Sequence, residues 1–209
     1  DKVVCVVDKQ IIMDYYFTAI IRVNMNLFFK DVKPGTESRL KTVDHTETYG
    51  RHILERILKD HKITACIDLG YGNGDDLKLV RKYSPNAKLY GVDFMTKKDN
   101  AIQTFALNLE YDKLPLEDES VDFIIANQIL EHTKEIYWIN HEISRVLKKG
   151  GHVFIGVPNG LSLHNRLLGL FGIHPTSSKL LSAHVRFFSK RDTYLFYNVI
   201  AKRFLKTKK

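Results

Sequence analysis

Four short apolar runs alternate along this chain with segments whose apolar residues recur at helical spacing. The runs lie at residues 65–69, 88–92, 121–126 and 152–157. A strand of a parallel sheet is covered by helices on both faces, so it reads as a continuous apolar run. Strands that alternate with helices are typical of βαβ units. The pattern predicts an α/β fold with a Rossmann-like, doubly wound and mostly parallel sheet that has helices on both faces.

Two helices are indicated by local signals. One is predicted from Asp44, which resembles a capping box together with Glu47. The clearest helix lies between the third and fourth runs, and we expect Gly150 and Gly151 to stop it. The apolar faces of the two helices consist of Ile53, Leu54, Ile57 and Leu58, and of Ile136, Ile139, Ile143, Val146 and Leu147.

Length and composition predict one globular domain with a small extension. The chain has 209 residues, of which 44% are hydrophobic and 27% charged, enough to bury a core. Residues 1–43 are interpreted as an N-terminal extension and linker, with a role as a substrate lid, and residues 44–209 as the main domain. After Ser189 about 20 residues remain. We expect one helix from Arg191 to about Ile200 and a truncated C-terminal hairpin.

Charge and cysteine content limit the compartments and partners that we expect for the protein. Charged residues interrupt the apolar stretch 3–29, so no membrane span is predicted. Cys66 lies in an apolar run and is expected to be a core residue, which fits a reducing, cytoplasmic compartment. The net charge is +8, and residues 202–209 carry five positive charges without an acid. Such a tail is either a solvated end or a contact for anionic partners.

A glycine-rich loop follows the first apolar run. Gly70, Gly72 and Gly74 occupy alternate positions, where they allow a ligand to approach the backbone closely. A dinucleotide site requires a further glycine at the position of Asp75, so the nicotinamide pattern fails. Asp75 and Asp76 would also repel a pyrophosphate at the start of the next helix, although acids there stabilise a helix dipole in any case. A sulfonium ligand meets no such conflict.

The loop and three later motifs resemble the class I S-adenosylmethionine-dependent methyltransferases, in the group of compact domains of methyltransferase type 11. The resemblance covers roughly residues 45–160. Its motifs in order are DLGYGNG, LYGVDF, LPLEDESVDFIIANQILEH and SRVLKKGGHVFIGVPN. It implies S-adenosyl-L-methionine as the cofactor and methyl transfer to a small-molecule, sugar-linked or lipid-linked acceptor.

The resemblance assigns the cofactor-binding residues. Asp68 and the loop, with Tyr71 inside it, are expected at the methionine half of the cofactor, together with the backbone of Asn127. Asp93 is expected to accept both ribose hydroxyls. Asn108 takes the place of an acidic residue that often meets the adenine amino group, and Glu110 is the alternative. The candidates around adenine are Phe94, Met95, Asn108 and Leu109.

Two histidines are candidates for catalysis, and no metal site is predicted. His132 is a candidate general base, with helix capping or packing as an equal alternative. His184, in a stretch that covers the acceptor pocket of some relatives, is the second candidate, with a structural lid contact as its alternative. His141 and Glu142 begin like a zinc-protease helix, but Arg145 stands where the second histidine ligand belongs.

The rest of the chain bears on the acceptor. Arg51 and Tyr49 are candidates for the cofactor carboxylate or for a surface role. The segment 160–188 is apolar in its first half, which predicts a lid over a small or lipid-linked molecule, a peripheral membrane contact, or packing against the sheet. Two other functions stay open: an RNA or nucleic-acid methyltransferase that uses the basic tail, and a non-catalytic member that binds S-adenosylmethionine.

Overall fold

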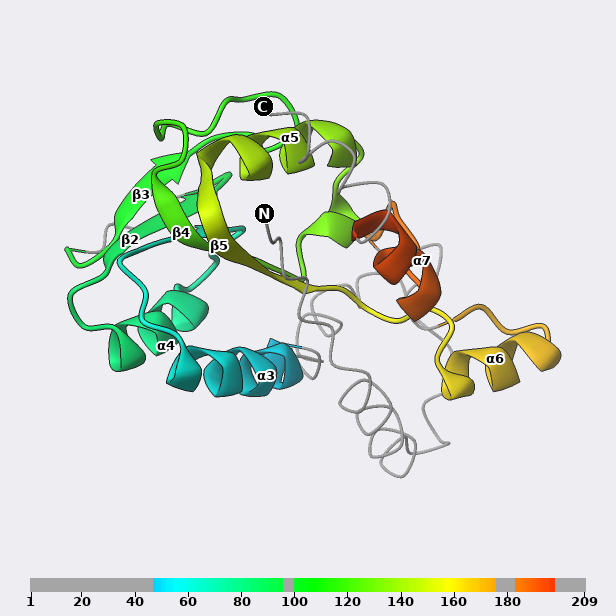
Figure 1. Ribbon diagram of the computed structural model, residues 1–209. Helices are drawn as coiled ribbons and strands as arrows, with labels where there is room; N and C mark the ends of the chain where they lie inside the picture. The colour runs from blue at the N-terminus through cyan, green and yellow to red at the C-terminus, as the bar shows by residue number, and fades with distance from the viewer. Residues whose placement is uncertain (1–46, 96–99, 176–182, 198–209) are drawn as a thin grey trace.

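The computed structural model describes residues 47–95, 100–175 and 183–197, with side chains from Gly50 onward (Figure 1). The predicted extension 1–43, the capping box at Asp44 and the basic tail lie outside the described residues. The described elements, in chain order, are α3 Glu47–Asp60, β1 Ala65–Leu69, α4 Asp75–Tyr83, β2 Lys88–Asp93, β3 Gln103–Ala106, β4 Val121–Asn127, η2 Leu130–His132, α5 Ile136–Val146, β5 Leu147–Gly156, α6 Leu163–Leu170 and α7 Lys190–Leu195.

The described strands form one five-stranded sheet in the order β3-β2-β1-β4-β5, and each neighbouring pair is parallel. This confirms the predicted α/β, Rossmann-like architecture. Strand β1 lies in the centre, where Ile67 pairs with Tyr90 on one side and with Ile124 on the other. The carboxyl ends of β1, β2 and β4 therefore meet at one edge, at the point where the strand order reverses. Ligands bind at such an edge in open α/β sheets.

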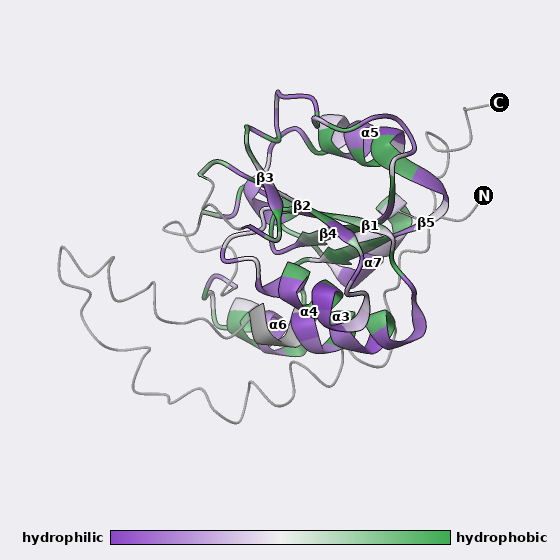
Figure 2. Cartoon of the chain, turned by 90° about the vertical axis from the view of Figure 1, so that its left-hand side faces the viewer, coloured by the Kyte–Doolittle hydropathy of each residue, from purple (hydrophilic) through white to green (hydrophobic). Residues whose placement is uncertain are grey.

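Helices cover both faces of the sheet (Figure 1). On one face Cys66 and Ile125 pack with Leu54 of α3 and Leu77 of α4. On the other face, residues of β1 and β4 that alternate with these pack against α5, with Ile139 at the contact. Figure 2 shows hydrophobic residues concentrated in the strands and hydrophilic residues on α3 and α4. Cys66 is fully buried, as predicted for a core residue.

Two predictions of local structure were wrong or incomplete. Helix α5 ends at Val146 rather than at the glycine pair, because Leu147 is already extended and begins β5. Gly150 has a φ of 78° and lies with Gly151 in an irregular stretch of β5, where the register with β4 shifts. Strand β3 was not predicted, since its four residues are half-buried or exposed at the sheet edge and form no apolar run.

The chain after β5 leaves the sheet and returns to it. Asn159 forms an isolated parallel bridge with Phe188, and the backbone N–H of Gly160 donates to the Phe188 carbonyl at 2.7 Å. Helix α7 begins at Lys190, close to the predicted start, and the expected strand near Phe204 lies outside the described residues. Among the helices that the structure describes, none has the length and apolar content needed to cross a membrane.

Candidate functional site

The glycine loop joins β1 to α4 and requires glycine for conformational reasons. Gly70, Gly72 and Gly74 have φ values of 75°, 52° and 73°, a left-handed region that side chains with a Cβ rarely adopt. A Cβ on Gly70 would lie 2.8 Å from Ile129 Cδ1. Within the described residues, a Cβ on Gly72 would meet nothing closer than a backbone oxygen at 4.0 Å, so this glycine is not packed against them. The loop thus presents bare main chain at the carboxyl edge of the sheet.

Asp93 ends β2 directly beside this loop. Its Oδ2 accepts a hydrogen bond from the Gly72 backbone N–H at 3.0 Å, and its Oδ1 accepts one from the Phe94 N–H at 2.7 Å. A carboxylate has about four lone-pair positions, so two remain for further donors such as a sugar diol. Phe94 and Met95 follow with 70% and 84% of their surface exposed, which leaves apolar surface next to the carboxylate.

Asp68 is a buried carboxylate at the end of β1. Burial raises its pKa well above the ordinary value, the negative charges of Asp76 and Asp93 raise it further, and Arg51 opposes the rise. No described residue donates a hydrogen bond to its side chain. A buried carboxylate of this kind favours a cationic ligand, because a positive charge would offset the cost of its ionisation. The ammonium group of an amino-acid ligand has the matching charge.

The two acids after the loop, Asp75 and Asp76, bind other side chains of the protein. Asp76 is buried, its Oδ1 accepts from Arg51 Nε at 2.8 Å, and its Oδ2 accepts from Asn127 Nδ2 at 2.9 Å. Asp75 accepts from Lys78 at 2.7 Å and lies 3.5 Å from Arg51. The proposed repulsion of a pyrophosphate is therefore weakened, since these cations neutralise both charges. Arg51 is engaged by the same acids, and the side chain of Tyr49 lies outside the described part.

The side chains of Tyr71 and Asn127 point toward the interior of the protein. Tyr71 is buried, and a Cβ on Gly91 would lie 2.8 Å from its ring. Asn127 fills the space that Gly50 and Gly156 leave free, because Cβ atoms there would lie 2.7 and 2.2 Å from its Oδ1. The contact predicted for Asn127, through its backbone to the methionine half of the cofactor, stays a prediction.

The candidates for the adenine contact follow β3. Asn108 Oδ1 accepts from the Glu110 backbone N–H at 3.0 Å, and the Asn108 N–H donates to Asp112 Oδ2 at 2.7 Å. The side chain of Asn108 thus stabilises a turn, while Leu109 packs against the core. Glu110 accepts a hydrogen bond from the Lys134 backbone N–H, so its carboxylate is directed to the segment after η2.

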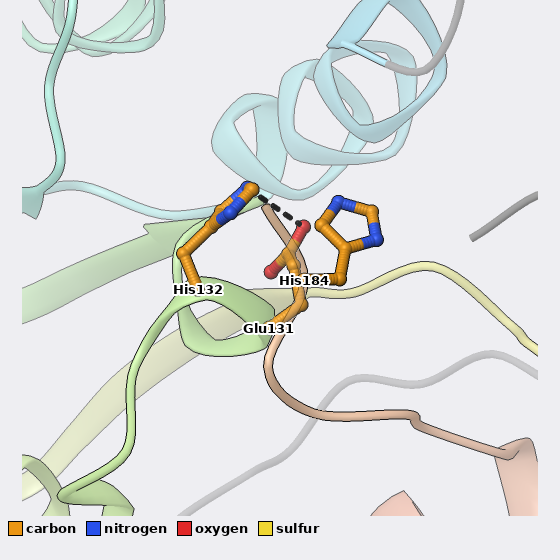
Figure 3. A group of neighbouring side chains, drawn as sticks. All are labelled: Glu131, His132 and His184. Carbon is orange, nitrogen blue, oxygen red and sulfur yellow. Dashed lines mark ion pairs between the residues drawn. The ribbon is translucent and has the colours of Figure 1, made fainter. Parts of the chain in front are cut away.

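The structure brings the two candidate catalytic histidines together. The ring centroids of His132 and His184 lie 4.7 Å apart in an edge-to-face arrangement, although 52 positions separate them in the sequence. Figure 3 shows a third group, the Glu131 carboxylate, beside both rings. The ligand atoms of these three residues all lie within 4.8 Å of one another. Backbone N–H groups of Val185 and Arg186 donate to the Glu131 carbonyl at 2.8 and 3.1 Å and hold the two segments together.

Glu131 is the functional candidate that the sequence did not reveal. Its side chain is 1% exposed, and neither carboxylate oxygen has a partner at hydrogen-bonding geometry. Burial raises its pKa to about 7, and the electrostatic influence of its own backbone N–H only moderates the rise. Burial also lowers the pKa of His132; the Ala183 carbonyl opposes this shift and His184 adds to it. The Leu-Glu-His stretch was the only sequence signal for Glu131.

Comparisons with known proteins agree with this geometry. Residues 67–155 match a family model described as a methyltransferase domain. A 37.1 kDa protein of transposon TN4556 from Streptomyces fradiae is 29% identical over 134 residues, covering 60% of this chain and 39% of that protein. Malonyl-acyl-carrier-protein O-methyltransferase 1 of Coxiella burnetii is 26% identical over 125 residues, covering 57% and 44%. The chain thus spans about two fifths of the length of these curated relatives.

Solved structures show the same fold at low sequence identity. A methyltransferase from Haloferax volcanii in complex with the Trm112 methyltransferase activator has a TM-score of 0.58 at 16% identity, covering 81% of this chain and 73% of that one. The YcgJ protein of Bacillus subtilis has a TM-score of 0.55 at 18% identity, covering 72% and 67%. Residues 67–155 are thus similar to the methyltransferase-domain family, and the described part of the chain shares the fold of these solved structures.

Proposed function

We propose that this protein binds S-adenosylmethionine at the carboxyl edge of the sheet and transfers its methyl group to a small or lipid-linked acceptor. One observation carries the proposal: the exposed main chain at Gly72 is not packed against other described residues, and the Asp93 carboxylate is bound to the same loop. The bare loop suits the amino-acid part of the cofactor, and the free lone pairs of Asp93 suit its ribose diol.

The buried residues of the site fit the same ligand. The ammonium group of the cofactor would offset the buried charge of Asp68. The exposed Phe94 and Met95 offer apolar surface to adenine next to Asp93. Asn108 follows the strand that pairs with β2, since Ala106 of β3 lies opposite Asp93. It would meet the adenine amino group only if its turn rearranged or its second lone pair were used.

The chemistry asks little of the protein beyond positioning. When bound, S-adenosylmethionine supplies a methyl group that its sulfonium already activates. The chain must therefore hold cofactor and acceptor in line and exclude water, which accounts for most of the rate gain available to such a reaction. We propose that the acceptor binds next to His132 and His184. These two histidines lie just beyond the end of β4.

The surface beyond this pair favours an acceptor with an apolar part. Helix α6 and the residues after it expose Leu163, Leu167, Leu170, Phe171 and Ile173. In Figure 1 this helix lies beyond α7, away from the sheet. Phe188, at the end of the segment, packs against the core as the packing alternative expects. The exposed side chains of α6 do not, and they would contact the hydrocarbon of a lipid-linked acceptor or a membrane surface.

The proposal is tested by calorimetry with S-adenosylmethionine and the variant Asp93→Ala. Loss of two charge-assisted hydrogen bonds should weaken binding roughly 100-fold. The matched control is Asp60→Asn, which changes an exposed acid at the end of α3 and should bind like the unmodified protein. Equal affinity of Asp93→Ala and the unmodified protein would contradict the proposed site. Binding without methyl incorporation into any acceptor would identify a non-catalytic member instead.

A further inference from the structure

We propose that Glu131, His132 and His184 bind a divalent transition-metal ion. Among the residues that the structure describes, they form the only group of three or more His, Cys, Asp or Glu side chains placed to share an ion. The ion would hold an oxygen-bearing acceptor next to the methyl group. This last step depends on the proposed function, whereas the metal site itself does not.

The first argument is the state of Glu131. Its carboxylate is 1% exposed, and both oxygens lack a hydrogen-bond partner. Buried polar groups are nearly always paired, and a buried carboxylate without a partner is strongly unfavourable. The carboxylate is directed toward the two imidazole rings (Figure 3). A cation bound there would satisfy the oxygens and supply the missing opposite charge.

The second argument is the orientation of His132. Its Nδ1 lies 3.2 Å from the Ala183 carbonyl oxygen, which can only accept, so Nδ1 carries the proton. The lone pair of the neutral ring is then on Nε2, and this atom lies 4.0 Å from Glu131 Oε1. A backbone carbonyl that fixes the tautomer in this way is the usual outer partner of a metal-binding histidine. Two electron-rich atoms thus face each other at a distance too long for a hydrogen bond.

The third argument is that the backbone already holds the ligands in place. Two N–H groups, those of Val185 and Arg186, share the Glu131 carbonyl, and Arg186 Nε donates to the Thr133 carbonyl at 2.9 Å. These bonds hold the segment of His184 against η2 and the residue that follows it. Ligands of a tetrahedral ion at about 2.0–2.1 Å lie about 3.3 Å apart, so modest side-chain rotations would close the observed separations.

The ligand set indicates the class of ion. Two imidazoles and one carboxylate suit zinc, cobalt or iron, whereas magnesium prefers oxygen ligands alone. Three protein ligands leave at least one coordination position for an acceptor oxygen. That oxygen would form the new bond to the methyl carbon while the carbon–sulfur bond breaks and its electron pair stays on sulfur. The proton of the acceptor hydroxyl passes to water, and S-adenosylhomocysteine is released.

The test is a titration of the full chain, freed of metal by chelation, with Co²⁺ followed by visible absorption and by competition with Zn²⁺. We expect one Co²⁺ to give ligand-field bands that one Zn²⁺ removes. Glu131→Gln and His184→Ala should each weaken the affinity by roughly 100-fold or more, because loss of even an outer partner costs about 10–100-fold. Circular dichroism checks the fold of each variant, and if one fails to fold the other decides.

The chain offers a matched control. His61 and His152 also place their ring centroids 4.7 Å apart, but they belong to no such group of three ligands. His152→Ala should therefore bind Co²⁺ like the unmodified protein. Absence of the bands, or equal titration of the Glu131 and His184 variants and the unmodified protein, would overturn the metal site. Asp93→Ala should lose the cofactor and keep Co²⁺, and Glu131→Gln should do the reverse, so failures of the two proposals are distinguishable.

Discussion

At the scale of single residues, the site combines two buried carboxylates that no described group neutralises through a hydrogen bond. Asp68 lies in β1, just before the glycine loop, and Glu131 lies in η2, and burial raises the pKa of both. A folded protein that retains such groups sacrifices stability at neutral pH. We interpret this loss of stability as a consequence of binding. An ammonium group would neutralise Asp68, and a metal ion would neutralise Glu131.

The cost at Asp68 predicts a dependence of stability on pH. Its pKa is raised from 3.8 in the folded protein, so the acid contributes stability that is fully present below about pH 3.8 and is lost as the pH rises through the folded pKa. Asp68→Asn should therefore become more stable than the unmodified protein as the pH rises from 5 to 7. The gain is at most about tenfold in the folding constant per pH unit.

Urea unfolding without cofactor at several pH values measures this effect. Glu117→Gln, which alters an exposed acid in the loop before β4, should follow the unmodified protein at every pH. Parallel curves for Asp68→Asn and the unmodified protein would show that the carboxylate is not destabilising. Calorimetry on the same variant should show weaker binding of S-adenosylmethionine.

These residues also show what the sequence can reveal. The proximity of the glycine loop and Asp93 was predictable, because both follow strands of one parallel sheet, whose carboxyl ends meet at one edge. The partnership of Glu131 with His184 was not, since 53 positions separate them and metal-site motifs depend on short spacing. The sequence also did not reveal that Asp76 is buried and bonded to Arg51. An acid in a first helical turn gives the same sequence pattern whether it faces a ligand or a neighbouring helix.

At the scale of elements, helix α5 positions the loop that leads into β4. Arg145 donates to both carboxylate oxygens of Glu142 at 2.8 and 2.9 Å, and to the carbonyls of Leu114 and Leu116 at 2.9 and 2.7 Å. The Leu114 N–H donates to Glu142 Oε2 at 2.8 Å. Glu142, which together with His141 resembles the start of a zinc-protease helix, therefore forms a buried structural ion pair with Arg145.

This ion pair gives a prediction for stability. Arg145→Met should cost about 3–5 kcal/mol, because it leaves the Glu142 carboxylate buried without its counter-charge. The double variant Glu142→Gln with Arg145→Met should recover part of that loss. Arg56→Met, at an exposed position of α3, is the control and should stay within about 0.5 kcal/mol of the unmodified protein. Urea denaturation measures all three, and a single variant as stable as the control would refute the structural role.

The elements differ in how well the sequence predicts them. Strands β1, β2, β4 and β5 were visible because burial on both faces demands continuous apolar runs. Strand β3 lies at the edge with only four partly exposed residues, so no run marks it. The end of α5 was misplaced because the glycine pair resembles a helix stop, whereas the chain passes directly from Val146 into a strand and uses Gly150 for its irregular register.

At the scale of the whole molecule, the described chain divides into a part where we propose that the cofactor binds, called the cofactor side, and a part where we propose that the acceptor binds, called the acceptor side. The cofactor side consists of the sheet with α3, α4 and α5, and its apolar side chains lie in two clusters on the two faces. The acceptor side begins after β5 and carries α6, whose apolar residues remain exposed. This contrast is the main support for an acceptor that brings hydrocarbon with it.

The exposed surface of α6 predicts affinity for lipid. Leu170 and Phe171 are 80% and 78% exposed, so replacing both with serine should leave the folding stability within about 0.5 kcal/mol. The double variant should lose binding to vesicles of neutral lipid while calorimetry with S-adenosylmethionine is unchanged. Tyr111→Ser, which changes an exposed aromatic residue outside this segment, is the control. Vesicle sedimentation at moderate salt decides, and equal binding of the variant and the unmodified protein would exclude a lipid contact through α6.

The bridge between Asn159 and Phe188 has a consequence for how such enzymes diversify. The chain departs from the scaffold and rejoins it at adjacent points, held there by the bond between Gly160 and the Phe188 carbonyl. A segment whose two ends are held close together can be lengthened, shortened or exchanged at small entropic cost. If the intervening residues contact the acceptor as proposed, evolution or a protein engineer can exchange them and so change the acceptor, while the sheet and its glycine loop stay unchanged.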